Sequence, residues 1–254
     1  MLEQWFEGKV ALVTGGADGI GREAALLFAR RGGMVAVADV NSDAGEQTCE
    51  MITAEHGTSA FFHTDVASKD SVARFVSGAV DRFGRIDVAF NNAGITDPRD
   101  DSWDDEAFER TLAINLAGVN QCMKEQIPHM LRSGGGAIVN TSSIHGFIAN
   151  PALFLPAYTA SKHAVIGLTK AVALQYAKDN MRVNALCPGV TATAMIRQTM
   201  DRDEAARKMI EGHAPIGRVA DPREVAEAAI WLASGAASFI TGHALVVDGG
   251  FLAQ

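Results

Sequence analysis

Short apolar runs alternate with longer amphipathic segments along the chain. Valine, alanine and isoleucine dominate several runs, a composition typical of parallel strands that are covered on both faces. The segments between the runs place apolar residues at helical spacing, as residues 72–83 do. The predicted strands are Val10–Thr14, Met34–Val40, Ala60–Val66, Ile86–Asn91, Ala137–Ser142, Arg182–Leu186 and Ala244–Val247.

This strand–helix–strand repetition predicts right-handed crossovers and a doubly wound α/β sheet. No internal repeat, low-complexity tract or linker interrupts it. We therefore predict a single Rossmann-type domain over residues 1–254, with a seven-stranded parallel sheet and helices on both faces. The helices include Arg22–Arg31, Ser68–Arg82, one long helix over Ala107–Leu131, and Arg223–Ala233.

Composition excludes some functions. Hydrophobic residues make up 48% of the 254 positions and charged residues 20%, an ordinary globular balance. The net charge of −8 argues against nucleic acid as the main partner, because phosphate binding needs a basic footprint. The three cysteines are dispersed, which favours reduced thiols in the cytoplasm. We see no signal-peptide pattern and no apolar stretch of bilayer length, so we expect a soluble protein without membrane contact.

The first predicted strand leads into a glycine-rich turn, Gly15-x-x-x-Gly19-x-Gly21, and then into a helix. Glycines let the backbone approach a pyrophosphate closely, and the phosphate charge then faces the helix N-terminus. The spacing differs from the G-x-G-x-x-G of the general dinucleotide fingerprint. The turn favours nucleotide binding, although a purely structural turn can have the same composition.

The second predicted strand contains Asp39, about 20 residues beyond the glycine turn, where an acid can bond the adenosine ribose hydroxyls. Its charge would repel a 2′-phosphate, no arginine follows it, and Asp18 adds a second negative group. These features favour NAD over NADP. In the alternative interpretation, Asp39 only ends the strand and leads into a helix that starts near Asn41.

Two further strand ends carry candidate residues at the edge where α/β proteins bind ligands. Asp65 and Val66 close the third strand, although Asp65 could instead cap the following helix. Asn91-Asn92-Ala93-Gly94 follows, and either braces neighbouring loops beside a ribose or forms a plain turn. We expect the acid-rich segment Asp97–Glu106 to be a solvated loop and an acidic helix start.

The remaining candidate chemistry lies between the fifth strand and the next helix. The strand delivers Ser142 and Ser143 to the same edge, and His145 follows. No G-x-S-x-G elbow surrounds the serines, and the histidine spacing predicts no metal site. Tyr158 and Lys162 lie one helical turn apart on one helix face. This pair indicates catalysis only if a cofactor binds beside it.

Asn115 falls inside a predicted helix, where asparagine is unfavourable, and marks either a local irregularity or a functional position. With these residues assembled, the chain resembles the short-chain dehydrogenase/reductase family over essentially its full length. The resemblance rests on Thr14-Gly15-x-x-x-Gly19-Ile20-Gly21, Asn91-Asn92-Ala93-Gly94, Asn115, Ser143, Tyr158-x-x-x-Lys162 and Pro188-Gly189.

The resemblance implies hydride transfer between NAD(H) and a secondary alcohol or ketone. Tyr158 would be the general acid/base, and Lys162 would contact the nicotinamide ribose and lower the tyrosine pKa. Ser143 would hold the substrate oxygen, and Asn115 would tether a water that links Lys162 to solvent. Implied cofactor contacts are Gly15, Asp18, Gly19, Ile20, Gly21, Asp39, Asp65, Val66, Asn92, Ala93, Gly94, Tyr158, Lys162, Pro188 and Gly189, with Thr191 and Thr193 at the nicotinamide carboxamide.

Residues 190–217 correspond by position to the substrate-binding lid of that family, although a helix pair packed on the core would look similar. The methionines of this segment, with Phe147, Phe154 and Leu155, predict a largely apolar pocket and therefore an apolar or cyclic substrate. The candidate substrate contacts are Ser143, His145, Phe154, Tyr158 and Met195. The resemblance also implies a homotetramer. The alternative function is an NADP-dependent reductase of 3-oxoacyl carrier-protein thioesters, against which Asp39 argues.

Overall fold

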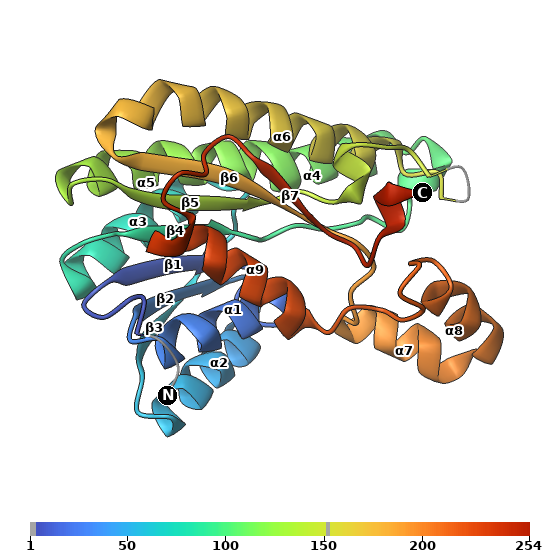
Figure 1. The fold of residues 1–254 in the computed structure, drawn as a ribbon, viewed down its shortest axis with the longest axis horizontal. Coiled ribbons are helices and arrows are strands. Elements are labelled where there is room, and N and C mark those ends of the chain that lie inside the picture. Colours follow the sequence, from blue (N-terminus) through green and yellow to red (C-terminus); the bar gives the residue numbers. More distant parts are fainter. Residues whose placement is uncertain (1–3, 151–152) are drawn as a thin grey trace.

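The computed structural model describes residues 4–150 and 153–254, apart from the side chains of residues 194, 195, 198 and 199. Seven strands form one sheet in the order β3-β2-β1-β4-β5-β6-β7, and every neighbouring pair is parallel (Figure 1). The predicted doubly wound α/β fold is confirmed. The strands are β1 Val10–Thr14, β2 Met34–Asp39, β3 Thr58–His63, β4 Val88–Asn91, β5 Gly136–Thr141, β6 Met181–Pro188 and β7 Ala244–Val247.

Helices cover both faces of the sheet (Figure 1). Helices α1 Gly19–Arg30, α2 Ser42–Ala54 and α9 Pro222–Ala233 bury one apolar cluster against it. Helices α3 Lys69–Phe83, α5 Val119–Arg132 and α6 Pro156–Tyr176 bury a second cluster on the opposite face. Because both faces are buried, the central strands read as continuous apolar runs. Among the described residues, no helix has both the length and the apolar character needed to cross a bilayer.

Two sequence predictions need correction at their boundaries. Strand β3 ends at His63, so Asp65 and Val66 lie in the loop beyond it rather than in the strand. The predicted long helix Ala107–Leu131 is three segments: α4 Asp105–Leu112, a π-helical turn η2 Ala113–Gly118, and α5. The π-helical turn contains Asn115, and such turns often mark functional sites.

The segment expected to form a lid contains two short helices, α7 Ala194–Arg202 and α8 Glu204–Glu211. In Figure 1 they project from the body of the molecule beyond the end of β6. They therefore lie at the carboxyl edge of the sheet, the edge at which parallel α/β sheets bind ligands.

Candidate active site

Three of the four residues expected to handle the proton, Ser143, Tyr158 and Lys162, come together at the carboxyl edge. On α6, the Lys162 Nζ atom lies 5.4 Å from the centroid of the Tyr158 ring. Ser143, just beyond the end of β5, lies close enough to the Tyr158 phenol for its side chain to lower the pKa of that phenol. Lys162 is buried, and its ammonium group donates to the carbonyl oxygen of Thr141 at 3.0 Å.

Burial shifts the pKa values of this pair in opposite directions. Desolvation raises the pKa of Tyr158, and the Ser143 side chain opposes that rise. Desolvation lowers the pKa of Lys162 to about 8, against a smaller opposing effect of Cys187. In the chain without a cofactor, phenolate desolvation outweighs the favourable contacts, so the pKa is raised. The lowering expected beside Lys162 and bound NAD⁺ stays a prediction for the complex.

Asn115 is fully buried and locks a neighbouring loop. Its Oδ1 accepts from the backbone N–H of Ile95 and its Nδ2 donates to the Ile95 carbonyl oxygen, both at 2.8 Å. A second Nδ2 contact reaches the Ser161 hydroxyl at 3.3 Å. A Cβ on Gly94 would lie 3.2 Å from Asn115 Oδ1 and 3.4 Å from Lys162 Nζ. The π-helical turn thus holds Asn115 against the loop after β4, close to the Gly94 position that also faces Lys162.

The two serines after β5 have different partners. Ser142 donates to the carbonyl oxygen of Lys162 at 2.8 Å, which ties the strand end to α6. Ser143 accepts from the backbone N–H of His145 at 3.2 Å and faces Tyr158. The buried His145 ring meets the Tyr158 ring edge-on, with centroids 5.6 Å apart, and its Nδ1 lies 3.2 Å from the Thr159 hydroxyl. Its pKa is lowered, mainly by burial.

The glycine turn is braced by the segment after β4. The Thr14 hydroxyl accepts from the backbone N–H groups of Asn92 and Ala93 at 3.0 and 3.1 Å. The Asn92 amide donates to the carbonyl oxygens of Thr14 and Gly15. Gly15 has φ +67°, and a Cβ there would lie 2.9 Å from the Ala93 Cα, so only glycine fits. A Cβ on Gly21 would overlap the Gly15 carbonyl oxygen.

A cavity of about 390 Å³ opens beside this turn. The Asp39 carboxylate lies in its wall, accepting from the backbone N–H of Ala17 at 3.1 Å and from that of Asn41 at 3.0 Å. Asp39 therefore orders the glycine turn and also leads into the helix capped by Asn41, as the alternative interpretation required. The lining residues are Gly15, Asp39, Val40, Thr64, Asp65, Val66, Ala67, Ala93, Gly94, Ile95, Arg110, Ala113 and Ile114.

The cavity lining offers groups that could contact an adenosine. Val66 and Ile114 offer apolar walls for a flat base, and the Asp39 carboxylate can accept from ribose hydroxyls. Asp65 does not cap α3, because the N-cap of that helix is Ser68. Instead, Asp65 Oδ1 accepts from the backbone N–H of Ala67 at 2.9 Å. Sequence reasoning missed Arg110 and Ile114, although their i,i+4 spacing beside Asn115 would have placed them on one helix face.

The predicted contacts at the far end of the cofactor lie around the end of β6. Pro188 ends the strand, and Gly189 donates to the Val247 carbonyl oxygen at 2.9 Å. Thr191 is buried and bridges to Ala220. A Cβ on Gly19 would lie 3.5 Å from the Thr193 methyl group, so the start of the lid faces the glycine turn.

Four remaining predicted residues are less closely tied to the site. Asp18 is exposed and occupies the N-cap position of α1 without a side-chain cap bond, and Ile20 packs partly on the core in the first turn. Phe154 is 49% exposed and packs on Trp103, with ring centroids 5.2 Å apart. Met195 lies in α7, and its side chain falls outside the described residues.

The acid-rich segment Asp97–Glu106 is only partly as predicted. Asp104 caps α4 by accepting from the Ala107 N–H at 2.7 Å, which confirms the acidic helix start. The prediction of a solvated loop is wrong for Asp97 and Asp100, each 2% exposed. The Asp97 carboxylate accepts from the backbone N–H of Arg99 and pairs with Arg110, and the Asp100 carboxylate accepts from two backbone N–H groups of α6. These partners compensate for the burial of both acids.

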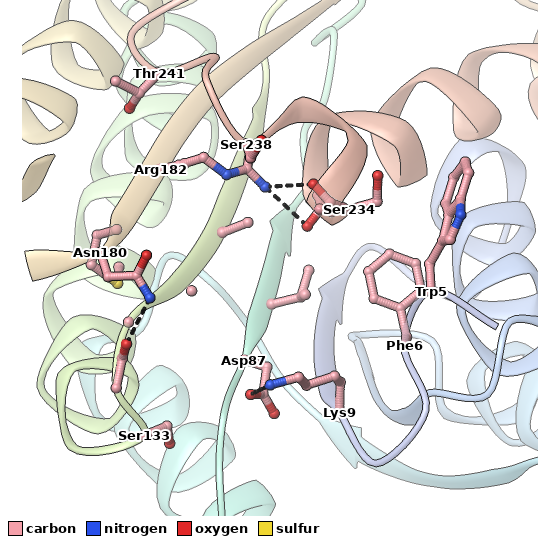
Figure 2. Close-up of a pocket in the computed structure, with 18 of the residues that line it drawn as sticks. Trp5, Phe6, Lys9, Asp87, Ser133, Asn180, Arg182, Ser234, Ser238 and Thr241 are labelled. Atoms are coloured by element: carbon pink, nitrogen blue, oxygen red, sulfur yellow. Dashed lines mark hydrogen bonds and ion pairs between the residues drawn. The ribbon is translucent and has the colours of Figure 1, made fainter. Parts of the chain in front are cut away.

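A larger cavity, of about 600 Å³, lies at the amino edge of the sheet, the opposite end from Tyr158. Figure 2 shows Lys9 paired with Asp87 and Arg182 bonded to the chain near Ser234. The Arg182 guanidinium also donates to the carbonyl oxygens that end α9. The charged side chains Lys9, Asp87 and Arg182 of this cavity therefore form structural bonds. We assign the chemistry to the carboxyl edge of the sheet instead.

Comparisons with known proteins agree with this geometry. Residues 15–252 match the family model described as enoyl-(acyl carrier protein) reductase. The 2,5-dichloro-2,5-cyclohexadiene-1,4-diol dehydrogenase of Sphingobium indicum is 42% identical over 251 residues, covering 97% of this chain and 98% of that protein. The cyclohexanol dehydrogenase of an Acinetobacter species is 39% identical over 256 residues, covering 100% and 99%.

A solved structure gives the same result in three dimensions. The crystal structure of a short-chain type dehydrogenase/reductase from Mycobacterium marinum has a TM-score of 0.92 and 33% identity, covering 99% of this chain and 98% of that one. The chain therefore belongs to the short-chain dehydrogenase/reductase family, whose members use nicotinamide cofactors. Both relatives are named as dehydrogenases of cyclic alcohols, and this chain, as a member of their family, is an oxidoreductase.

Proposed function

We propose that the protein transfers a hydride between NAD(H) and a cyclic or otherwise apolar secondary alcohol, with Tyr158 as the general acid/base. The observation that carries this proposal is the convergence of Ser143, Tyr158 and Lys162 beside the cavity that Asp39 lines. Gly94 joins the two regions, since it lines the cavity and a Cβ on it would lie 3.4 Å from Lys162 Nζ.

The preference for NAD rests on Asp39. Its carboxylate offers acceptors to ribose hydroxyls, whereas a 2′-phosphate would meet a like charge at the same place. The glycine turn would hold the pyrophosphate against the N-terminus of α1, and Thr191 and Thr193 would hold the nicotinamide end. When bound, NAD supplies the hydride acceptor or donor.

The protein residues handle the proton. In oxidation, the Tyr158 phenolate takes the hydroxyl proton of the alcohol while the carbon-bound hydrogen leaves as hydride, so a ketone forms. In reduction, neutral Tyr158 donates that proton to the carbonyl oxygen. Ser143 bonds the same oxygen as charge develops on it. Lys162, held by the Thr141 carbonyl oxygen, adds positive charge beside the phenol when it is protonated.

The substrate class draws on the relatives. Two similar proteins are named for ring substrates, a dichlorocyclohexadiene-diol and cyclohexanol. A secondary alcohol on a six-membered carbon ring would suit a site whose neighbours include His145 and the partly exposed Phe147. The lid formed by α7 and α8 would close over such a substrate.

Assembly and location stay predictions: a homotetramer in the cytoplasm. Leu174, on α6, is 80% exposed in the single chain, as an interface residue would be. Analytical ultracentrifugation gives the assembly directly; a monomer at micromolar concentration would contradict the tetramer.

The function is tested with a panel of secondary alcohols and their ketones, assayed in parallel with NAD(H) and NADP(H). We expect turnover of cyclohexanol-type alcohols with NAD⁺, read as NADH absorbance, and weak turnover with NADP⁺. The panel includes an acetoacetyl thioester with NADPH. Activity confined to that thioester would replace the proposal with the carrier-protein reductase.

A further inference from the structure

The helix that carries Tyr158 is capped by a residue from a distant loop. Asp100, in the 3₁₀ turn η1 Asp100–Ser102, is 2% exposed. Its Oδ1 accepts from the backbone N–H of Ala157 and its Oδ2 accepts from that of Tyr158, each at 2.9 Å. The carboxylate therefore joins the loop after β4 to the first turn of α6, across 57 and 58 positions of sequence.

These two bonds complete the start of α6. The first N–H groups of a helix have no partner within it. Pro156, at the first helical position, has no N–H, and Leu155 at the N-cap position forms no side-chain cap bond. The N–H of Thr159 already bonds to the Leu155 carbonyl oxygen at 2.9 Å. The N–H groups of Ala157 and Tyr158 are the ones left over, and Asp100 takes both.

The opposite side of the catalytic segment has its own anchor. Ser142 donates to the Lys162 carbonyl oxygen at 2.8 Å, and the Lys162 ammonium donates to Thr141. Residues 157–162 are thus held by β5 at one end and by Asp100 at the other. Without Asp100, Tyr158 would sit in a helical turn with two unpaired backbone donors beside a loop, a turn prone to fray.

We propose that Asp100 is a positioning residue that fixes the backbone of Tyr158 and thereby the place of its phenol relative to Ser143. It acts through Tyr158 and does not touch the substrate. The proposal rests on the proposed function, because it assigns a catalytic consequence to the cap. It also predicts a property of the protein that needs no substrate, namely slow exchange of the Ala157 and Tyr158 amide hydrogens.

The test uses Asp100→Ala and Asp100→Asn in the full chain, with Asp101→Asn as the matched control, since Asp101 is the exposed acid of the same turn. We expect Asp100→Ala to lower kcat about tenfold or more, while the dissociation constant for NADH stays within about twofold. Asparagine keeps one acceptor and should fall in between. The control should behave as the wild type.

A second-site rescue separates positioning from general stability. Leu155→Asp places an acid at the N-cap of α6, where aspartate caps the following N–H groups from within the helix. In the Asp100→Ala background it should restore a substantial part of kcat. It should also slow the exchange of the Tyr158 amide, which Asp100→Ala accelerates.

The outcomes are distinct. If Asp100→Ala keeps wild-type kcat, or if kcat, NADH binding and cooperative unfolding are lost together and the rescue fails, Asp100 is not a positioning residue. If the wild type itself turns over no alcohol with NAD⁺, the proposed function fails. In that case the cap is still tested on its own. If the Ala157 and Tyr158 amide hydrogens exchange at the same rate in Asp100→Ala as in the wild type, Asp100 does not cap α6.

Discussion

The Lys162 ammonium lies 5.4 Å from the centre of the Tyr158 ring, within the range of a cation–π contact. The lysine is held there by the Thr141 carbonyl oxygen rather than by a carboxylate. In the part of the chain that the structure describes, no carboxylate pairs with Lys162, and burial shifts both residues toward their neutral forms. The site by itself holds a neutral phenol ready to donate a proton.

The first prediction concerns the proton donor. Tyr158→Phe removes the hydroxyl and should lower kcat by about 10²-fold or more, because general acid/base catalysis contributes on that order. NADH affinity, measured by fluorescence titration, should stay within about twofold. Tyr176→Phe is the control, since it alters the other tyrosine of the chain, at the far end of α6. Near-normal turnover in Tyr158→Phe would contradict the mechanism.

The second prediction concerns the choice of cofactor. Asp39→Ala should lower the ratio of kcat/KM for NAD⁺ to that for NADP⁺ by about tenfold or more, because it removes a charge that repels a 2′-phosphate. Asp43→Ala, an exposed acid at the start of α2, should leave the ratio unchanged. A wild-type enzyme that already prefers NADP⁺ would overturn the electrostatic argument.

The third prediction is the titration of Tyr158. The chain has two tyrosines, so phenolate absorbance in Tyr176→Phe reports Tyr158 alone. We expect a pKa above the ordinary value of about 10, because burial disfavours the phenolate. Adding Ser143→Ala should raise it further, since the Ser143 side chain lowers it.

The raised pKa of Tyr158 determines how the rates of oxidation and reduction change with pH. Oxidation needs the phenolate, which is the minor form below the pKa, so the oxidation rate should rise with pH until the pKa of the complex is reached. Reduction needs the neutral phenol and should be favoured at lower pH. NAD⁺, through its positive ring, should lower the titration midpoint. A Tyr158 pKa clearly below about 10 in the protein without cofactor would contradict the burial argument.

The fourth prediction concerns a buried amide network beneath the site. Asn91 and Gln126 exchange hydrogen bonds at 2.9 and 3.2 Å, and Asn91 also donates to Asn140 at 3.0 Å. Gln126→Ala leaves the Asn91 oxygen unpaired and opens a cavity, and should cost about 3 kcal/mol in the free energy of unfolding. Gln121→Ala, on the same helix, should cost less than about 1 kcal/mol. Urea denaturation compares the two; equal losses would show that the network contributes no special stability.

The fold and much of the candidate site follow from local features of the sequence. Strands buried on both faces read as apolar runs, so six of the seven predicted strands match the structure to within about two residues. The glycine turn could be predicted because Gly15 has a positive φ and no room for a Cβ, and only glycine meets both conditions. The exception, β3, was placed too far along, because Thr64, Asp65 and Val66 continue its pattern although they line the cavity instead.

What the sequence could not show depends on contacts between distant segments. Asp97 and Asp100 look like any exposed acids until the fold brings Arg110 and the first turn of α6 to them. The π-helical turn at Asn115 arises where that side chain bonds the loop of Ile95.

Because periodicity and backbone limits are local properties, the sequence alone predicts the sheet, the glycine turn and the candidate residues for proton transfer. The direction of the Tyr158 pKa shift and the cap on its helix depend on the tertiary structure. Desolvation and hydrogen-bond partners exist only after the chain has folded.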